Sequence, residues 1–394
     1  MIEWHTMNQA TMRGNCETLI LLVGSNPLPN YLTATVLQPN KVVLVHTPET
    51  RAPAERLHSV LGTQVEVEMR GLAKASDPRE IAETIRRIMS DPSSERVHLN
   101  YTGGTKIMAA HARMAFRENG GKDQHASYLN DGDRCLFFDD GQLVALENLN
   151  LGLTLDLIGQ IHGCEMLPHS GRATDGPTEE DAGTIAATVA RDAKLAKCLC
   201  DAGQRLKKRG KPRKALEQPW RPQDLGLTLS AIQVPEEDWD DNRFKAWWRF
   251  LGGGWLEVAV AAWTRQATGL IPSQRNDWRL KGRRFEIDVA LVRGHRLYVI
   301  SCTTDDTLGL CKSKLFEVAM RTRQLGGDLA RSALVCLIDG QDDNGKYIDQ
   351  LRSDVKSVWE APNTPQAFGL ADLREWAGAT GSPNFDTLTR WLNS

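Results

Sequence analysis

Two short loops in the first half of the chain combine glycine, hydroxyl and cationic side chains. One spans residues 24–30 (GSNPLPN) and the other residues 102–106 (TGGTK), directly before a helical pattern. Glycines let backbone N–H groups approach a ligand closely, and the N-terminus of a following helix favours an anion. Thr105 adds a hydroxyl group and Lys106 a positive charge. The two loops therefore predict a phosphate-binding site.

The two loops match neither of the common nucleotide fingerprints. The Gly-x4-Gly-Lys-Ser/Thr spacing of a phosphate-binding loop is missing, and so is an early Gly-x-Gly-x-x-Gly. A turn followed by a helix cap is an alternative explanation for the Gly-Gly-Thr sequence alone. Thr47, Glu49 and Asn130 stand at other predicted strand ends and could touch a base or ribose, but we expect them to cap helices or turns.

Three carboxylates in the last third of the chain predict a metal site. Glu257 lies within an apolar helical stretch, where burying a carboxylate costs several kcal/mol unless it is paired or metal-bound. Glu286 and Asp288 are two residues apart on a predicted strand, so both face the same side. A hairpin turn at residues 293–295 would place Asp288 beside Ser301. Carboxylate oxygens suit Mg²⁺ or Mn²⁺, which polarise phosphate and activate water.

The elements that must position these residues follow from hydrophobic patterning. Strand-like runs at residues 18–24, 41–47, 63–69 and 96–102 alternate with helical patterns at 31–37, 52–61, 78–89 and 106–116. This alternation indicates βαβ units and a parallel sheet, whose ligands bind beyond the carboxyl ends of the strands. Runs at residues 125–130, 134–140 and 142–148 predict antiparallel strands at the sheet edge.

The second half predicts a different order of elements. We expect a long helix at about 243–268, a hairpin formed by residues 283–292 and 295–304, a helix at 311–325, and a strand at 332–339. Gly252, Gly253 and Gly254 lower helix propensity and suggest a close helix approach or a hinge. Four tryptophans recur here at near-helical spacing and are expected to pack in a core or dimer interface rather than stack on bases: Trp247, Trp248, Trp255 and Trp263.

Composition narrows the class of protein. The 394 residues carry a net charge of −2, so a nucleic-acid site, if present, must be local. The apolar run at residues 19–23 is too short for a membrane span. Eight cysteines without metal-like pairing favour a reduced, cytoplasmic protein. Residues 204–214 hold seven basic side chains, which could grip phosphates or form a solvated linker face.

The two loops resemble a known family. Residues 23–30 (VGSNPLPN) and 100–112 (NYTGGTKIMAAHA) are similar to the signature loops of CARF domains, the sensors of type III CRISPR defence proteins. The resemblance implies a Rossmann-like homodimer that binds a cyclic oligoadenylate across its two-fold axis, and an even-membered ring such as cyclic tetra-adenylate suits that symmetry. The residues that match the family's ligand-binding positions are Ser25, Asn26, Pro27, Thr102, Gly103, Gly104, Thr105 and Lys106.

The resemblance extends to the last third of the chain. Residues 252–263, 285–292 and 297–304 look like the PD-(D/E)xK-type nuclease domain that is fused to CARF sensors, whose metal site uses a helix Glu, a hairpin Asp and a Glu-x-Lys. This chain has Ser301, Cys302 and Thr303 in place of Glu-x-Lys. Glu286 could replace the missing carboxylate, and Lys312 or Lys314 the missing lysine. Asp305 and Asp306 are further possible ligands, although an exposed loop is expected there.

These observations predict an α/β protein with a Rossmann-like parallel sheet followed by an α/β restriction-endonuclease-like domain. We expect a CARF-like sensor at residues 1–165, a helical and basic connecting region at 166–235, and a nuclease-like effector at 236–394. The catalytic candidates are Glu257, Asp288, Glu286 and Lys314, and the three acids are the candidate ligands of Mg²⁺ or Mn²⁺.

The corresponding function is that of a CRISPR-associated antiviral effector. Cyclic tetra-adenylate would bind between the first domains of a homodimer and allosterically activate metal-dependent cleavage of DNA or RNA. The sequence leaves open whether the domain cuts, because the Glu-x-Lys residues are absent. One alternative is a nuclease-like domain that binds nucleic acid or a partner without cutting. Another is an unrelated α/β enzyme that uses a nucleotide cofactor.

Overall fold

The first sheet consists mostly of parallel strands in the order β1-β8-β7-β6-β5-β2-β3-β4. The computed structural model describes residues 5–6, 16–92, 96–130, 132–147, 149–167, 176–199, 246–247, 249–339, 348–359 and 363–393. The strands of this sheet are β1 (His5–Thr6), β2 (Thr18–Leu22), β3 (Lys41–His46), β4 (Glu66–Gly71), β5 (Val97–Asn100), β6 (Ala126–Asn130), β7 (Cys135–Phe138) and β8 (Gln142–Ala145).

Strand pairing confirms the predicted βαβ organisation and corrects one detail. Strands β4, β3, β2, β5 and β6 run parallel to their neighbours, and only β6–β7 and β7–β8 are antiparallel pairs. The run at residues 125–130 was expected to be an antiparallel edge strand, but β6 pairs in parallel with β5. The short β1 pairs in parallel with β8 at the edge. Strand β6 is therefore where the sheet changes direction.

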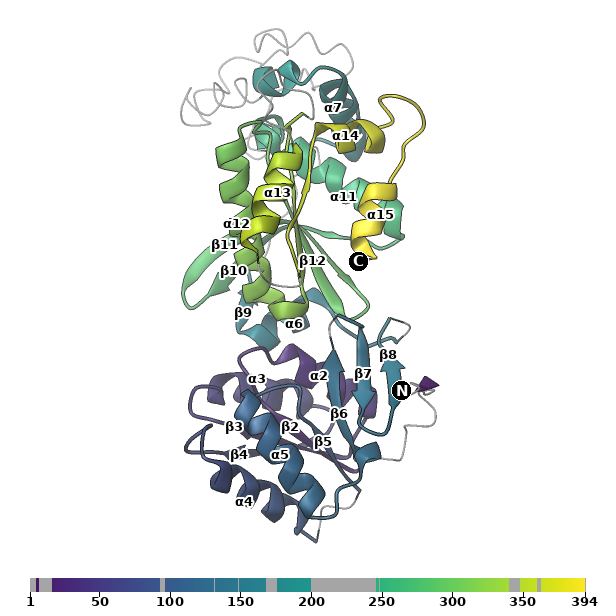
Figure 1. Cartoon of the computed structure of the whole chain (residues 1–394). Helices are drawn as coiled ribbons and strands as arrows, with labels where there is room; N and C mark the ends of the chain where they lie inside the picture. Colours follow the sequence, from purple (N-terminus) through teal and green to yellow (C-terminus); the bar gives the residue numbers. More distant parts are fainter. Residues whose placement is uncertain are drawn as a thin grey trace.

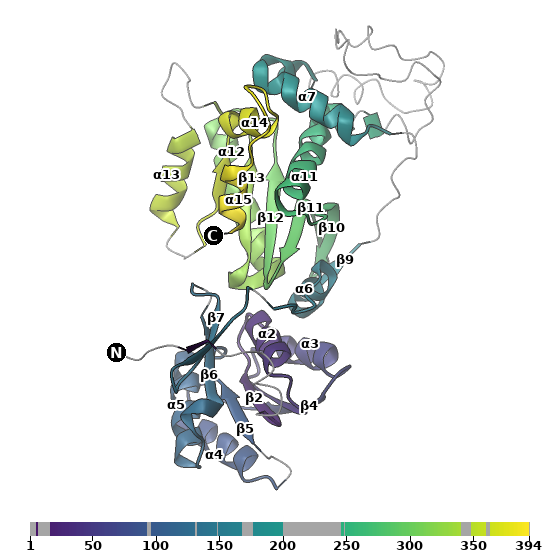
Figure 2. The ribbon, with the colours of Figure 1, turned by 90° about the vertical axis from the view of Figure 1, so that its right-hand side faces the viewer.

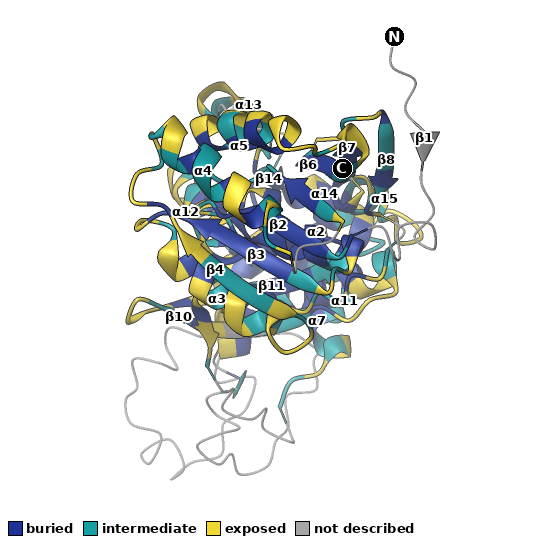
Figure 3. Cartoon of the chain, turned by 90° about the horizontal axis from the view of Figure 1, so that it is seen from below, coloured by how far each residue is buried: buried dark blue, intermediate teal, exposed yellow. Residues whose placement is uncertain are grey.

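Helices cover both faces of the first sheet, which is why β2 is buried along its whole length. One face is covered by α2 (Leu28–Leu37) and α3 (Arg51–Leu61), and the other by α4 (Pro78–Met89) and α5 (Lys106–Glu118). In Figure 3, β2 and β3 are dark blue, whereas the outer sides of the helices are yellow. Local signals set the start of α4, because Pro78 suits the first helical turn and Asp77 accepts the Arg79 N–H at 2.9 Å.

The second sheet has the order β14-β13-β12-β11-β10-β9. Its first four strands in sequence form antiparallel pairs, and β12, β13 and β14 are parallel. The predicted hairpin is present as β11 and β12, whereas the sequence patterns did not reveal β9 and β10. The bounds are β9 (Cys164–Met166), β10 (Ser273–Leu280), β11 (Arg283–Arg293), β12 (Arg296–Cys302), β13 (Arg331–Val335) and β14 (Gln366–Phe368).

Two helical layers enclose this second sheet. One layer contains α7 (Glu179–Arg191), α11 (Trp255–Thr268), α14 (Leu370–Trp376) and α15 (Asp386–Leu392). The other contains α6 (Leu155–His162), α12 (Leu308–Gly326) and α13 (Ile348–Val358). Figures 1 and 2 show this second domain above the first, with α6 and β9 where they meet. Among the helices of the described residues, none combines the length and the apolar character that a membrane span requires.

The tryptophans of α11 and the turn before it belong to the second core. Trp247, Trp255 and Trp263 are each at least nine-tenths buried, which supports the packing interpretation; the side chain of Trp248 lies outside the described residues. Residues Phe250–Gly254 form a π-helical turn before α11. Gly253 has a φ of 135° there, a conformation that glycine adopts readily.

The junction between the domains is shared by both cores. Ile158 of α6 packs in the core of the second domain, and Ile161 of the same helix packs in the core of the first. Strand β9 follows at once and pairs with β10, so the chain enters the second sheet at the position where we expected the first domain to end. Helix α7, from the expected connecting region, packs against the α11 core. The basic residues 204–214 lie outside the described part of the chain.

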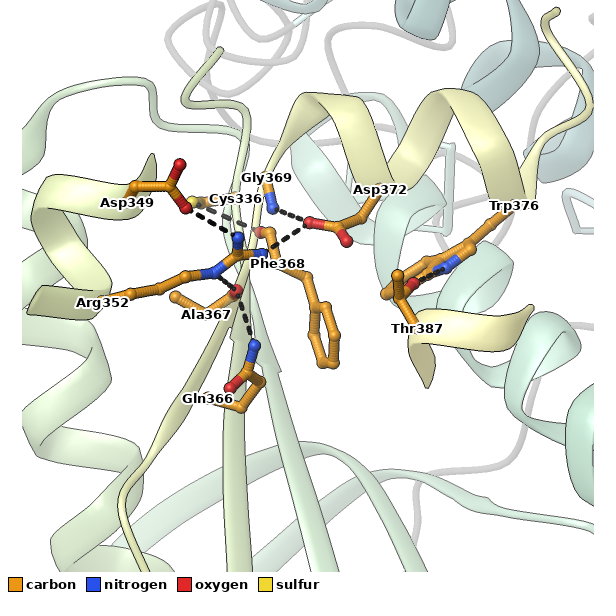
Figure 4. Close-up of polar contacts among 10 residues, drawn as sticks. All are labelled: Cys336, Asp349, Arg352, Gln366, Ala367, Phe368, Gly369, Asp372, Trp376 and Thr387. Carbon is orange, nitrogen blue, oxygen red and sulfur yellow. Dashed lines mark hydrogen bonds and ion pairs between the residues drawn. The ribbon is translucent and has the colours of Figure 1, made fainter. Parts of the chain in front are cut away.

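An ion-pair network around the buried Asp372 lies at the carboxyl ends of β13 and β14 (Figure 4). Asp372 of α14 accepts the Gly369 N–H at 2.9 Å and the Arg352 guanidinium at 3.0 Å. Arg352, from α13, also donates to Asp349 and to the Ala367 carbonyl. These charges are therefore engaged in tying α13 and α14 to β14, which accounts for a buried carboxylate without catalysis.

Candidate functional site

The two glycine-containing loops lie side by side, backbone against backbone. They follow β2 and β5, which are neighbours in the sheet. A Cβ atom on Gly103 would overlap the carbonyl oxygen of Leu22, and one on Gly24 would lie 3.0 Å from the Gly104 nitrogen. Only residues without side chains allow this approach. The structure therefore brings the two sequence-predicted loops together; residues 24–27 and 102–106 are called the paired loops below.

The exposed groups of the paired loops suit an anion. Thr105 is the N-cap of α5, and its Oγ1 accepts the Met108 N–H at 3.2 Å. Lys106 is the first helical residue, and it is exposed together with Thr105 and Ser25. The positive end of a 13-residue helix and a lysine thus point to the same edge. Hydroxyl groups, a cation and a helix N-terminus are the donors that phosphate groups bind.

Two other predicted residues shape the loops from within. The Thr102 hydroxyl oxygen accepts the Leu129 N–H at 2.7 Å, and the Thr102 N–H donates to Asn100 Oδ1 at 3.2 Å. Pro27 is buried directly before α2. Both residues hold the loops to the sheet, so their contribution to a ligand site is through backbone position.

Asn26 faces the second domain. Its Oδ1 accepts the Leu28 N–H at 3.2 Å, and His162 Nε2 lies 3.3 Å from the same oxygen. A Cβ atom on Gly327 would lie only 2.6 Å from Asn26 Nδ2. The residue predicted to bind the ligand therefore sits between the paired loops and the end of α12.

The three further candidates in this domain hold turns. The Thr47 N–H donates to Thr50 Oγ1 at 3.0 Å. Asn130 Oδ1 accepts the Gly132 N–H at 2.9 Å. The pKa of Glu49 is lowered, first by a hydrogen bond from Thr47. These contacts agree with the capping roles expected from the sequence.

Sequence reasoning missed a set of side-chain contacts that holds α5 behind the paired loops. The Tyr101 hydroxyl donates to Asp139 Oδ1 at 2.5 Å, and Arg113 of α5 pairs with the same carboxylate. Burial, together with the Asp139 carboxylate, raises the pKa of Tyr101. The three residues are far apart in sequence and belong to no motif, so no local signal could have found them. They fix α5, and hence Thr105 and Lys106, against the sheet.

A cavity of about 840 Å³ opens between α2, α3 and α6, away from the glycine contacts of the paired loops. Three of its hydroxyl groups donate to nearby backbone carbonyls: Thr35 to Tyr31, Ser59 to Glu55 and Thr63 to Val60. Because these donors are already engaged, we assign no ligand to this cavity.

Asp288 in the second domain is held by the neighbouring strand. Its Oδ2 accepts the Cys302 N–H at 2.6 Å and the Ser301 hydroxyl at 3.0 Å. The hairpin thus places Asp288 beside Ser301, as its turn predicted. A carboxylate that accepts two such bonds is fixed in orientation, which a metal or phosphate site requires.

Three of the four catalytic candidates act electrostatically on Cys302. The pKa of this half-buried thiol is raised well above its usual value, first by burial and then by the Asp288 and Glu257 carboxylates, whereas Lys314 lowers it. These charges come from three different elements, β11, α11 and α12. Glu257, Asp288 and Lys314 therefore lie within electrostatic range of Cys302, and we call these four residues the acidic centre.

The remaining candidates, Glu286 and Lys312, have different surroundings. Glu286 is exposed and stands opposite Asp277 in the β10–β11 register. Lys312 pairs with Asp354 of α13 at 3.1 Å, which leaves Lys314 as the lysine whose charge reaches Cys302.

The loop before α12 uses one of its acids structurally. Asp305 Oδ1 accepts the N–H and the hydroxyl of Thr307 at 2.8 and 2.6 Å, and thereby organises the start of the helix. Asp306 is exposed, as expected for a loop.

The acidic centre meets part of the needs of a divalent ion. Within the described ranges, no group of three or more His, Cys, Asp or Glu side chains is gathered for a metal. Mg²⁺ is often held by one or two carboxylates and several waters. Glu257 and Asp288 are two carboxylates of the kind that such an ion uses, and the assignment of Glu286 as a third ligand stays a prediction.

Comparisons with known proteins support the architecture. The sequence matches no family model and no curated protein. Can2 from Sulfobacillus thermosulfidooxidans, solved in complex with cyclic tetra-adenylate, is similar in structure with a TM-score of 0.69 and 18% identity, covering 96% of this chain and 100% of that chain. A Vibrio cholerae protein of known structure has a TM-score of 0.68 and 18% identity, covering 93% of this chain and 99% of its own.

A third solved structure is a type III CRISPR defence DNA nuclease activated by cyclic oligoadenylate. It has a TM-score of 0.51 and 18% identity, and the match covers 89% of this chain but 53% of that nuclease. At this level of identity the likeness establishes a shared fold. The α/β class predicted from the sequence, with a parallel sheet followed by a second α/β domain, is thereby confirmed.

Proposed function

We propose that this chain is a CRISPR-associated effector that binds cyclic tetra-adenylate at the paired loops and responds with a nuclease activity of its second domain. The observation that carries the proposal is the backbone packing of the two loops, which leaves Ser25, Thr105 and Lys106 exposed at one sheet edge. The fold shared with Can2, which was solved with this ligand, supports it.

The ligand chemistry follows from charge and symmetry. A cyclic oligoadenylate carries one phosphate per nucleotide, and the paired loops offer hydroxyl groups, backbone amides and one lysine. In a two-fold homodimer these groups occur twice, which suits a ring with an even number of phosphates. We therefore propose that the ring lies across the dimer axis, with Lys106 of each copy on a phosphate.

The second domain is proposed to cut DNA or RNA phosphodiesters. Glu257 and Asp288, with Glu286 as the further candidate, would hold Mg²⁺ or Mn²⁺, which polarises phosphate and lowers the pKa of water. The Cys302 N–H and the Ser301 hydroxyl orient the Asp288 carboxylate. Lys314 would offset the charge that builds up on the phosphate, the role that the family's missing lysine has.

A second candidate function is binding without cutting. It is favoured by Ser301 and Thr303, which stand where the similar nucleases have Glu and Lys. The incomplete set of metal ligands among the described residues points in the same direction. In this case the ligand would make the second domain bind nucleic acid or a partner protein.

One set of assays distinguishes these functions. The intact protein is titrated with cyclic tetra-adenylate by calorimetry and incubated with plasmid DNA, single-stranded DNA and RNA, with Mg²⁺ or Mn²⁺, with and without the ligand. We expect saturable binding and cleavage only when ligand and metal are both present. Binding without cleavage of any substrate favours the second candidate. Absence of binding, or tight binding of a mononucleotide or dinucleotide instead, contradicts the proposal.

Lys106→Ala tests the ligand site. Loss of a charge-assisted contact of about 1.5–3 kcal/mol should weaken ligand binding by roughly 10- to 100-fold. Lys122→Ala is a matched control because Lys122 is also exposed but follows the opposite end of α5. Equal affinities of the two variants would show that Lys106 is not a ligand contact.

A further inference from the structure

We infer that α12 couples the paired loops to the acidic centre, with Asn26 acting as a positioning residue through Gly327. This inference rests on the proposed function and names the element that would carry its regulation. Asn26 immediately follows Ser25, an exposed residue of the paired loops, and its side chain contacts the residue that ends α12. Lys314 lies about two turns from the other end of the same helix, and its neighbour Leu315 packs with Val299 of β12, the strand that carries Cys302.

The contact at Gly327 is close. This residue has a φ of 68°, and any Cβ atom there would collide with the amide group of Asn26. The next residues continue the link, because Leu329 packs in the core of the first domain although it follows α12 in the second. A displacement of the loop at Asn26 therefore acts directly on the end of α12.

The polar contact between Asn26 and His162 is weak, so the loop at Asn26 can move relative to the second domain. His162 Nδ1 lies 2.9 Å from the Ile158 carbonyl, which can only accept, so Nδ1 carries the proton of the neutral ring. Nε2 then presents a lone pair to Asn26 Oδ1, which already accepts the Leu28 N–H. This side of Asn26 is therefore held by packing rather than by a strong hydrogen bond to His162.

Helix α12 spans the distance between the contact at Gly327 and the acidic centre at Lys314. Its 19 residues, Leu308–Gly326, correspond to about 28 Å, and Lys314 lies about 18 Å from the Gly327 end. Figure 1 shows α12 running along the second domain, with its lower end beside α6 at the junction. A continuous helix transmits a shift at one end to the other because its backbone hydrogen bonds resist compression and bending.

The surroundings of the helix leave little room for the shift to be absorbed. Gly159 of α6 is so close to the Trp278 ring that a Cβ atom there would overlap it. The Cys164 thiol lies 3.8 Å from the Gln324 carbonyl in the last turn of α12. Packed interfaces of this kind move as units between discrete arrangements.

The consequence for regulation follows from differential binding. If cyclic tetra-adenylate favours one position of the loop at residues 25–26, it favours the corresponding position of α12 and of Lys314. Lys314 then approaches or leaves the Asp288 and Glu257 carboxylates. Ligand occupancy in the first domain thereby sets the charge arrangement of the acidic centre in the second.

Asn26→Ser tests the coupling when it is compared with the parent at saturating ligand, so that any change in affinity is measured separately. Serine at this position can still accept the Leu28 N–H, but its side chain is too short to reach Gly327 in the same way. Asn40→Ser is the matched control, since Asn40 is an exposed asparagine of the same domain. Calorimetry with cyclic tetra-adenylate, nuclease assays and hydrogen exchange of residues 308–326 are measured for the parent and both variants.

At ligand concentrations that saturate each variant's own site, we expect Asn26→Ser to lose at least about tenfold in ligand-stimulated cutting, in line with the usual size of allosteric coupling. The ligand should change hydrogen exchange across α12 in the parent and in Asn40→Ser, but not in Asn26→Ser. Without ligand, Asn26→Ser alone should exchange faster in the last turns of α12.

Three results would overturn the coupling. Asn26→Ser could respond to the ligand like the parent, it could lose ligand binding and cutting in equal measure, or the ligand could leave exchange in α12 unchanged in the parent. Failure of the proposed function itself is visible in the parent alone, as absent ligand binding. If the parent binds the ligand but cuts no substrate, the exchange measurements on α12 still decide the coupling.

Discussion

Asp288 offers the sharpest test of the acidic centre, because its two contacts with β12 and its charge can be separated. Its Oδ2 accepts the Cys302 N–H at 2.6 Å and the Ser301 hydroxyl at 3.0 Å. Asp288→Asn keeps an oxygen in place for these donors and removes the negative charge. Asp288→Ala removes both the oxygen and the charge.

The structural part of the effect follows from hydrogen-bond energetics. A donor left unsatisfied costs about 1–3 kcal/mol, and the Ser301 hydroxyl is half-buried and can turn to water. We therefore expect Asp288→Ala to lower the free energy of unfolding by about 2–4 kcal/mol. Asp288→Asn should lower it by about 1 kcal/mol, since a neutral acceptor makes a weaker bond than a carboxylate.

The chemical part of the effect should be the same in both variants. Each removes the charge that we assign to metal binding, so both should bind cyclic tetra-adenylate normally and cut at least about 100-fold more slowly. Both should also lower the pKa of Cys302, because the Asp288 carboxylate raises it in the parent.

The assays are urea unfolding, cleavage rates at saturating ligand and metal, and thiol alkylation of Cys302 against pH. Asp277→Asn is a matched control, since Asp277 is an exposed aspartate on the neighbouring strand β10. Equal unfolding midpoints for Asp288→Ala and Asp288→Asn would refute the hydrogen-bond argument. Cleavage by Asp288→Asn at the parent's rate would refute the active-site assignment.

Three further changes test the paired loops and the junction. Gly103→Ala should abolish cyclic tetra-adenylate binding in calorimetry and lower the melting temperature, because its Cβ would overlap the Leu22 carbonyl; Gly183→Ala, in open space on α7, should do neither. Thr105→Ala should lower the free energy of unfolding by about 1 kcal/mol through loss of the α5 cap, and Thr105→Ser should restore most of it. Burial lowers the pKa of His162 to about 4, so its contribution to stability is complete above the unfolded pKa near 6.5 and is lost as pH falls towards 4. His162→Gln should therefore make the urea unfolding midpoint depend less on pH between about pH 7 and pH 5. The same pH dependence of the midpoint in both proteins would contradict this.

The amino-acid sequence by itself determined the local elements and the residues of the two loops. Alternating apolar runs and helical periods predicted β2, β3, β5 and α4, because these periodicities follow from backbone geometry alone. The turn at residues 293–295 fixed the strand register that places Asp288 beside Ser301, since adjacent strands joined by a tight turn pair in a defined order. Composition added that any nucleic-acid site in this nearly neutral chain must be local.

Only the tertiary structure decided which distant side chains meet. The sequence named Lys312 and Lys314 as possible replacements for the missing lysine and favoured Lys314; in the structure Lys312 pairs with Asp354, whereas the charge of Lys314 acts on Cys302. The sequence also grouped Asn26 with the ligand residues, whereas domain packing sets its side chain against Gly327, about 300 residues away. Such contacts depend on how complete helices and sheets pack against one another, and a local sequence pattern does not determine that packing.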